Sequence, residues 1–227
     1  MPDEERIRHS VAAEARIVTD PDEQAHVEAA NALRQAERVR DYILQTIDGR
    51  PFKLRPSILL DLNRCAIEGL SAYAGVWRPA GIGIGKSEHA PPEGAAVPGL
   101  IEELCDYIND GWSKASAIHL SAMVMWRLNW IHPFSDGNGR TSRASSYLVL
   151  CAHEKAVFPG TRTIPAQIVD NRGPYYAALE AADTAFKRYG TLREGLVDEM
   201  EELIGNMFAQ QLASAFDSAS GYEKLSS

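Results

Sequence analysis

Twelve residues, HPFSDGNGRTSR at positions 132–143, concentrate the chemically useful side chains of this chain. His132 offers an imidazole, which can accept a proton near neutral pH, and Asp136 offers a hard oxygen ligand of the kind that Mg²⁺ prefers. Gly137 and Gly139 carry no Cβ atom, so their backbone can approach a ligand closely or adopt positive φ. These groups predict a site that binds a phosphate and transfers a proton beside it.

Arg140 and Arg143 are three residues apart and would share one side of a helix that begins near the Gly-Asn-Gly turn. Guanidinium groups suit phosphate oxygens, and a helix N-terminus attracts anions through its unpaired N–H groups and its dipole. Asn138 adds an amide donor between the two glycines. Two cations at this end of a helix oppose the dipole, so their presence favours an anion site over a plain connection.

The elements that must position this stretch are helices, because apolar residues recur at helical intervals over most of the chain. Leu120, Val124, Leu128 and Ile131, for example, form one apolar face directly before His132. In residues 20–47 the apolar set that recurs at helical intervals comprises Val27, Ala30 and Leu33, followed by Val39, Ile43 and Ile47. The predicted helices cover residues 20–47, 55–70, 97–110, 118–131, about 138–151, 173–189 and 192–212.

Residues 74–96 are the exception, since they are rich in glycine and proline and cannot form a helix. Ile82 and Ile84 alternate between glycines, which predicts a short extended or hairpin segment, called the flap below. The flap includes GIGIGKS, which is similar to a P-loop, but Ala80 stands at its first position and the following EHAPPEG cannot open a helix. We therefore expect an all-α bundle with one β-like flap and no Walker site.

Composition sets further limits. The chain has 227 residues, enough for one large domain, and its net charge of −8 disfavours general binding to nucleic acid. No apolar run approaches the ~20 residues that span a bilayer, and the charged first residues lack a signal-peptide core. Cys65, Cys105 and Cys151 are odd in number and without CxxC spacing, so we expect buried free thiols in a reducing cytoplasm.

The stretch at 132–143 resembles the signature of the Fic (Fido superfamily) proteins, HPFx[DE]GNGRxxR, at every specified position. The flap, the helix before His132 and the later NRGPYYAAL are also similar to Fic segments, in the expected order. The resemblance implies an all-α, Fic-type helical bundle with a short β-hairpin flap. It divides the chain into a possible inhibitory element at 1–21, a core at about 22–190, a C-terminal helix at 191–216 and a loose tail at 217–227.

The resemblance also implies an activity, because Fic proteins move AMP from ATP onto a Ser, Thr or Tyr hydroxyl of a target protein. His132 would be the base for that hydroxyl, Phe134 would pack into the core, and Asp136 would hold Mg²⁺ on the α- and β-phosphates. The rest of the motif would bind the nucleotide: the anion cradle would comprise Gly137, Asn138 and Gly139, and the outer phosphates would contact Arg140 and Arg143.

Two further sets of residues take roles from the resemblance. The flap would pair with the backbone of the target through Gly81, Ile82, Gly83, Ile84, Gly85 and Lys86. Tyr175 and Tyr176 either help to form the adenine pocket or are ordinary aromatic residues of a helix core. The identity of the target is not readable from the sequence, and self-association stays open.

A regulatory element is also implied. Many Fic proteins are similar in a helix of pattern [ST]xxxE[GN], whose glutamate pairs with the second motif arginine and displaces the γ-phosphate. SVAAEA at residues 10–15 places Ser10 and Glu14 at that spacing, with Ala15 departing from the pattern. We expect partial inhibition through Glu14 and Arg143; the alternative is a solvated N-terminal turn.

Other activities remain as alternatives. The related Doc-like toxins transfer the γ-phosphate and resemble one another in a loop with Lys in place of the second glycine, whereas this chain has Gly139. The remaining alternatives are removal of AMP, transfer from another nucleotide, and a non-catalytic nucleotide-binding adaptor.

Overall fold

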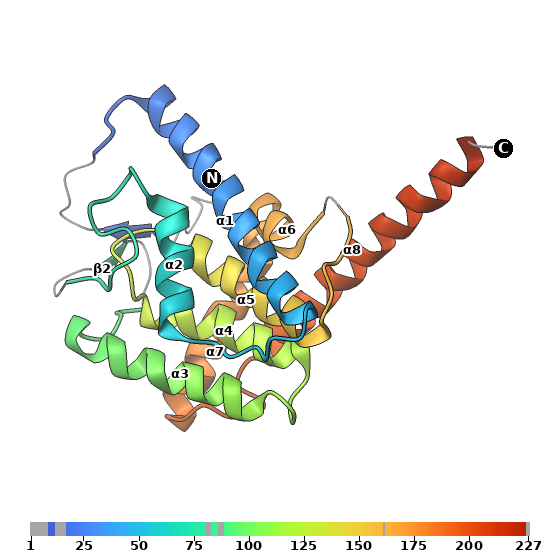
Figure 1. Cartoon of the computed structure of the whole chain (residues 1–227). Coiled ribbons are helices and arrows are strands. Elements are labelled where there is room, and N and C mark those ends of the chain that lie inside the picture. Colours follow the sequence, from blue (N-terminus) through green and yellow to red (C-terminus); the bar gives the residue numbers. More distant parts are fainter. Residues whose placement is uncertain (1–8, 12–16, 80–82, 86–88, 161, 226–227) are drawn as a thin grey trace, which may run out of the picture.

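The computed structural model describes residues 9–11, 17–79, 83–85, 89–160 and 162–225, with the backbone alone for 9–11, 83–85 and 217–225. Helices dominate these ranges (Figure 1), which confirms the predicted all-α class. The elements, in chain order, are β1 (His9–Val11), α1 (Pro21–Ile47), α2 (Pro56–Ile67), β2 (Gly83–Gly85), the short 3₁₀ turn η1 (Gly94–Ala96), α3 (Val97–Gly111), α4 (Ala117–Ile131), α5 (Asn138–Glu154), α6 (Ile164–Asp170), α7 (Arg172–Tyr189) and α8 (Asp198–Leu225).

α4 is the central helix of the bundle and is buried on almost every side. Its apolar residues all lie in the main core, including the predicted face of Leu120, Val124, Leu128 and Ile131. α5 packs along α4, and small residues let the two backbones approach, so that Ser121 donates a hydrogen bond to the carbonyl of Ser146 at 3.0 Å. A second apolar cluster joins α5 to α1 and α2. The motif loop joins α4 to α5, and the packing of both helices holds its two ends in place.

Local sequence explains where the helices begin. Asp20 caps α1 by accepting a hydrogen bond from the N–H of Glu23, and Pro21 follows at the first helical position. Ser116 caps α4 in the same way through the N–H of His119. The predicted apolar set of α1 is partly right, because Val39 and Ile43 are buried, whereas Leu33 is 69% exposed and Ile47 is 42% exposed.

The flap contains a short extended segment, which is one of the two predicted alternatives. Among the described residues, its only strand is β2, and β2 pairs in antiparallel register with β1 from the N-terminus, so that Ser10 lies opposite Ile84. A chain segment far away in sequence thus provides the pairing that a second flap strand would have given. Periodicity within residues 74–96 could not reveal a partner outside them.

Two further elements correct the sequence reading. α8 continues to Leu225 and extends away from the bundle (Figure 1), so the described part of the predicted loose tail is helical. That segment contains no proline and several good helix formers, which lets the helix run on. α6 was missed because seven residues are too few to show a clear period. No helix in the described part of the chain is long and apolar enough to cross a membrane.

The three cysteines, Cys65, Cys105 and Cys151, are free and buried, as the sequence predicts. Burial raises the pKa of both the Cys105 and Cys151 thiols to about 12. A thiol with such a pKa is a poor nucleophile at neutral pH, because little thiolate is present. The cysteines therefore belong to the packing of the core.

Candidate active site

The motif loop begins at His132, the residue that ends α4. Its N–H donates to the carbonyl of Leu128 at 3.0 Å, which closes the last turn, and its backbone then turns into the left-handed region with φ 51 and ψ 59. Non-glycine residues adopt this conformation rarely, and histidine is among those that tolerate it. The residue is 4% exposed, so the imidazole sits within the protein surface beside the loop.

Phe134 and Asn138 hold the loop in shape. The side-chain oxygen of Asn138 accepts a hydrogen bond from the N–H of Phe134 at 2.9 Å, and its amide nitrogen donates to the carbonyl of the same residue at 2.8 Å. The Phe134 ring is fully buried, as the resemblance implied, and lies 5.2 Å from the ring of Trp77. The side-chain amide of Asn138, expected to bind an anion, is thus engaged within the loop.

α5 starts at Asn138, directly after Gly137, which has φ 75. A Cβ atom on Gly137 would lie 2.7 Å from Cγ2 of Ile67 and 3.1 Å from Nδ2 of Asn63, so both the backbone conformation and the packing require glycine here. The first N–H groups of an α-helix point out of its start, where an anion can accept hydrogen bonds from them.

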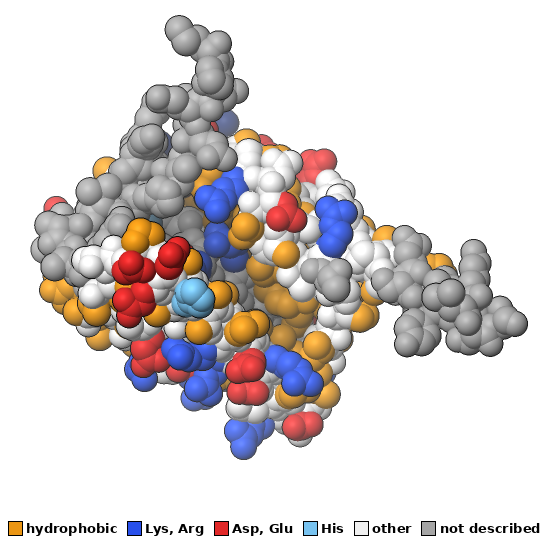
Figure 2. Space-filling model, turned by 90° about the horizontal axis from the view of Figure 1, so that it is seen from above, with side chains coloured by type: hydrophobic (Ala, Val, Ile, Leu, Met, Phe, Trp, Pro, Cys, Tyr) orange, Lys and Arg blue, Asp and Glu red, His pale blue; other side chains and the backbone are white. Residues whose placement is uncertain are grey.

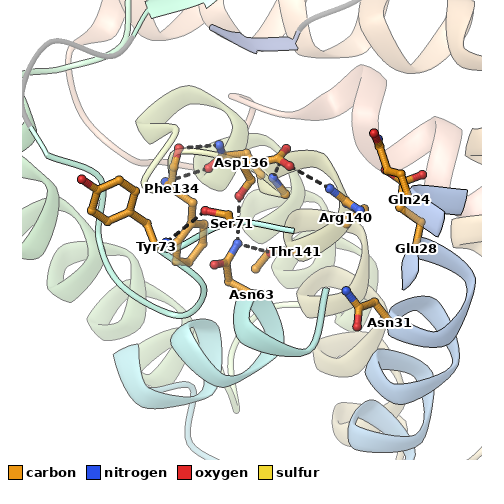
Figure 3. Close-up of polar contacts among 12 residues, drawn as sticks. Gln24, Glu28, Asn31, Asn63, Ser71, Tyr73, Phe134, Asp136, Arg140 and Thr141 are labelled. Atoms are coloured by element: carbon orange, nitrogen blue, oxygen red, sulfur yellow. Dashed lines mark hydrogen bonds and ion pairs between the residues drawn. The ribbon is translucent and has the colours of Figure 1, made fainter. Parts of the chain in front are cut away.

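Asp136 presents a carboxylate at the same helix start. One of its oxygens accepts from the N–H of Gly137 at 2.5 Å, and the other accepts from Arg140 at 3.1 Å (Figure 3). The side chain is 53% exposed, which leaves lone pairs of both oxygens open to solvent or a ligand. The predicted metal ligand and the predicted phosphate ligand Arg140 are therefore neighbours.

Asn63 of α2 supports the loop from below and was missed by the sequence reading. Its amide nitrogen donates to the carbonyl of Asp136 at 3.0 Å and to the hydroxyl of Thr141 at 3.3 Å, as Figure 3 shows, while its oxygen accepts from the N–H of Gly75. The residue is fully buried. A signal was present, because an asparagine interrupts the otherwise apolar inner face of this helix.

Arg143 lies deeper than Arg140. Burial lowers the pKa of its guanidinium, Tyr175 opposes that effect, and the charge of Arg172 adds to it. Among the described residues, the ion pairs do not include Arg143. Its Nη1 lies 3.1 Å from the position that a Cβ on Gly139 would take, so glycine makes room for it. A partly desolvated cation of this kind favours an anionic ligand.

The two tyrosines proposed for the adenine pocket differ in position. Tyr175 is 2% exposed and belongs to the main core, where its hydroxyl accepts a hydrogen bond from Asn129 at 2.8 Å. This position fits the alternative of a helix-core aromatic. Tyr176 is half-buried, with its ring centroid 5.5 Å from that of Tyr175, and it keeps a surface that a ligand could contact.

The remaining predicted residues lie partly outside the described ranges. Gly81, Ile82, Lys86 and Glu14 are not described, whereas Gly83, Ile84 and Gly85 form β2 and Ser10 lies in β1. Ser10 is thus in a strand rather than in the helix that the inhibitory pattern implies.

Outside the motif loop, charged side chains of both signs lie on the face drawn in Figure 2. On the face drawn in Figure 2, acidic and basic side chains are interspersed with apolar ones. Among the described residues, no cluster of three or more His, Cys, Asp and Glu side chains could hold a metal ion by itself. Asp136 is accordingly a single carboxylate, which suits a metal that also binds substrate phosphates.

Parts of this chain are similar to known proteins. Residues 53–150 match the family model described as Fic/DOC family. Protein adenylyltransferase fic-1 of Caenorhabditis briggsae is 32% identical over 111 residues, 48% of this chain and 20% of that protein. Protein adenylyltransferase Fic of Drosophila willistoni is 33% identical over 96 residues, 42% and 18% of the two chains. The chain thus spans about a fifth of the length of these curated relatives.

Solved structures extend the similarity to most of the fold. A Fic domain-containing signalling protein from Bacteroides thetaiotaomicron superposes with a TM-score of 0.67 at 20% identity, covering 85% of this chain and 72% of that one. Fic-1 from C. elegans gives 0.64 at 20% identity, with 92% and 56% covered. The part of the chain that matches the Fic/DOC family model includes the flap and the whole motif loop.

Proposed function

We propose that this protein transfers AMP from ATP to a Ser, Thr or Tyr hydroxyl of a target protein. The observation that carries the proposal is the loop from His132 to Arg143, in which a histidine, a carboxylate and a helix start with two arginines converge. The names of the curated relatives, protein adenylyltransferases, support it. A purely structural loop would not need a histidine in the left-handed region and an exposed Asp136–Arg140 pair together.

The reaction requires one base and several groups that neutralise charge. The oxygen of the target hydroxyl bonds to the α-phosphorus of ATP, the bond from that phosphorus to the bridging oxygen breaks, and pyrophosphate leaves. The proton of the hydroxyl moves to His132. The N-terminal N–H groups of α5, with Arg140 and Arg143, bind the phosphate oxygens, and positioning of this kind supplies most of the rate in phosphate chemistry.

Mg²⁺ is the cofactor that the site fits. Asp136 is one exposed carboxylate beside a phosphate-binding helix start, and Mg²⁺ typically combines one or two carboxylates with substrate phosphates and water. When bound, the metal neutralises charge on the α- and β-phosphates. The described residues offer too few ligands to retain the ion without nucleotide.

The flap is the proposed docking strand for the target. β2 already accepts one extended segment, because β1 pairs with it in antiparallel register. Strand addition binds mainly through the main chain, so a target segment could use the same edge with little demand on its sequence. A strand pair of three residues is too short to be stable by itself, so a target could displace β1.

The labelled-phosphate experiment tests the proposed reaction. We expect ATP labelled at the α-phosphate to label a protein in a lysate from the source organism, or this protein itself, in a Mg²⁺-dependent way. ATP labelled at the γ-phosphate should leave no label. Labelling from the γ-position alone would instead identify a kinase, and nucleotide binding without turnover would identify an adaptor.

The N-terminal segment is the proposed regulatory element, and it has two ways to act. Glu14 could pair with Arg143 and occupy donors that the γ-phosphate needs, as the sequence pattern implies. The β1–β2 pairing adds a second route, because β1 occupies the flap edge that a target would use. Both routes predict inhibition, but of different binding steps.

Single substitutions separate these routes. Glu14→Gly should raise AMP transfer severalfold, mainly at low ATP concentration. Ser10→Pro removes a backbone donor and disfavours the strand, so it should lower the KM for the target without changing the KM for ATP. Steady-state kinetics with each substrate varied will measure both effects. Wild-type values in both variants would reject N-terminal inhibition and leave the catalytic assignment intact.

A further inference from the structure

Arg78 lies in the part of the flap that precedes β2, and at 4% exposure it is one of the most buried charged residues among those described. Its backbone N–H donates to the carbonyl of Pro133 at 2.8 Å. Its side chain reaches the same segment, since Nε donates to the carbonyl of His132 at 2.6 Å and Nη2 lies 3.5 Å from the carbonyl of Ile131. One arginine thus bonds three consecutive carbonyls around the proposed base.

The same guanidinium also holds the returning limb of the flap, because Nη2 donates to the carbonyl of Pro92. His89, on that limb, donates from Nε2 to the carbonyl of Trp130 at 2.7 Å. The two limbs that flank β2 are therefore both bonded to the end of α4. Together, Arg78 and His89 cover the carbonyls of residues 130–133.

Carbonyls at the end of a helix have no partner within the helix, and a cation there is favoured by the dipole. At α4 this end is buried, so the carbonyls need protein donors rather than water. Burial is the main influence on Arg78 and lowers the pKa of its guanidinium, with Glu93 opposing. Burying a charged arginine costs free energy, and here its donors bond main-chain oxygens rather than a carboxylate. The geometry that these bonds fix is therefore a reason for its presence.

The geometry that it fixes is that of His132. The left-handed backbone of this residue, at φ 51, needs support from its surroundings, and the carbonyl that Arg78 bonds is its own. Holding that carbonyl sets the direction of the Cα–Cβ bond and hence of the imidazole. Because the guanidinium also bonds Pro92, it fixes the distance between the flap and the base.

We propose that Arg78, assisted by His89, is a positioning residue that locks the flap and His132 into one unit, so that a hydroxyl docked on the flap meets the base. This role rests on the proposed AMP transfer. Arginine is needed because its planar fork serves several carbonyls at once, whereas a lysine ammonium is a single compact charge. The nucleotide cradle is held separately, by Asn63 and the start of α5.

Arg78→Lys tests the role, with Arg127→Lys as the matched control. Arg127 is equally buried and lies on α4, but its guanidinium bonds the carboxylate of Glu103 at 2.7 Å and stacks on the ring of Trp130 at 4.3 Å, whereas Arg78 bonds main-chain carbonyls. We expect Arg78→Lys to lower kcat about ten- to a hundredfold, the usual effect of a displaced catalytic group, with the Kd of ATP changed less than about twofold. Arg127→Lys should lower the melting temperature but keep kcat within about twofold.

Amide hydrogen exchange supplies a readout that does not need activity. In Arg78→Lys, exchange should accelerate in residues 131–137 and 89–93 and stay at the wild-type rate in α5, whereas Arg127→Lys should not show this pattern. Unchanged kcat in Arg78→Lys, or equal losses of kcat in both variants, would overturn the role. A wild-type protein without any transfer would reject the proposed function, and the exchange pattern would then decide the role of Arg78 alone.

His89→Ala guards against failure of Arg78→Lys to fold, because it removes the donor to the carbonyl of Trp130 and buries no unpaired charge. We expect a severalfold loss of kcat at unchanged Kd for ATP. Should Arg78→Lys be unfolded and His89→Ala fully active, the locking role is rejected.

Discussion

His132→Ala should abolish AMP transfer while leaving nucleotide binding nearly intact. A positioned base contributes about 10²–10⁴-fold in rate, and removal of the imidazole leaves the phosphate donors of α5 in place. Turnover with α-labelled ATP measures the loss, and calorimetry measures the Kd of ATP. We expect that Kd to change by less than about threefold, because in the proposed reaction the histidine contacts the hydroxyl rather than the phosphates.

Two variants make this result specific. His132→Asn removes the base but keeps a residue that tolerates left-handed backbone, so it should be as inactive as the alanine variant and more stable. His153→Ala removes a partly exposed histidine at the far end of α5, bonded to the carbonyl of Trp112, and should keep full activity. More than about a tenth of wild-type turnover in either His132 variant means that another group takes the proton.

How much of this site the sequence could reveal depends on the range of the interactions. The loop and its helix start were predictable because they occupy consecutive residues, and the roles proposed for His132, Asp136 and Gly137 rest on their identity and spacing. The burial of α4 followed from its apolar pattern in the same way. Sequence patterns within one segment were therefore sufficient to predict the motif loop and the burial of the helix before it.

Contacts between distant segments could not be predicted in this way. Arg78 and His132 are 54 residues apart, and Asn63 and Asp136 are 73 apart, so no period or motif links them. The pairing of β1 with β2 is equally distant in sequence. The side chain of Asn138 was expected to donate to an anion, but it bonds the backbone of Phe134. Its place in the motif was thus predictable, whereas the partner of its side chain was not. Sequence patterns identify which groups are present, whereas long-range packing decides what each one bonds.

Asp136→Ala should remove the Mg²⁺ dependence of transfer and most of its rate. Loss of charge stabilisation at a phosphoryl centre is worth several kcal/mol, which corresponds to about a hundredfold or more in turnover. The side chain also accepts from Gly137 and pairs with Arg140, so the alanine variant loses some order in the loop as well. Asp136→Asn separates the two effects, since the amide oxygen can still accept from Gly137 while the charge is gone.

Both Asp136 variants should therefore have a similarly low rate, with the asparagine variant closer to wild type in melting temperature. Asp61→Asn is the matched control, because Asp61 of α2 also pairs with an arginine, Arg38 at 3.1 Å, and accepts from Tyr42, but faces α1. It should keep wild-type turnover. Calorimetry with Mg²⁺ alone should detect no tight binding to the wild-type protein, since one carboxylate is too small a ligand set. Tight binding without nucleotide, or Mg²⁺-dependent turnover that persists in Asp136→Asn, would place the metal on other residues.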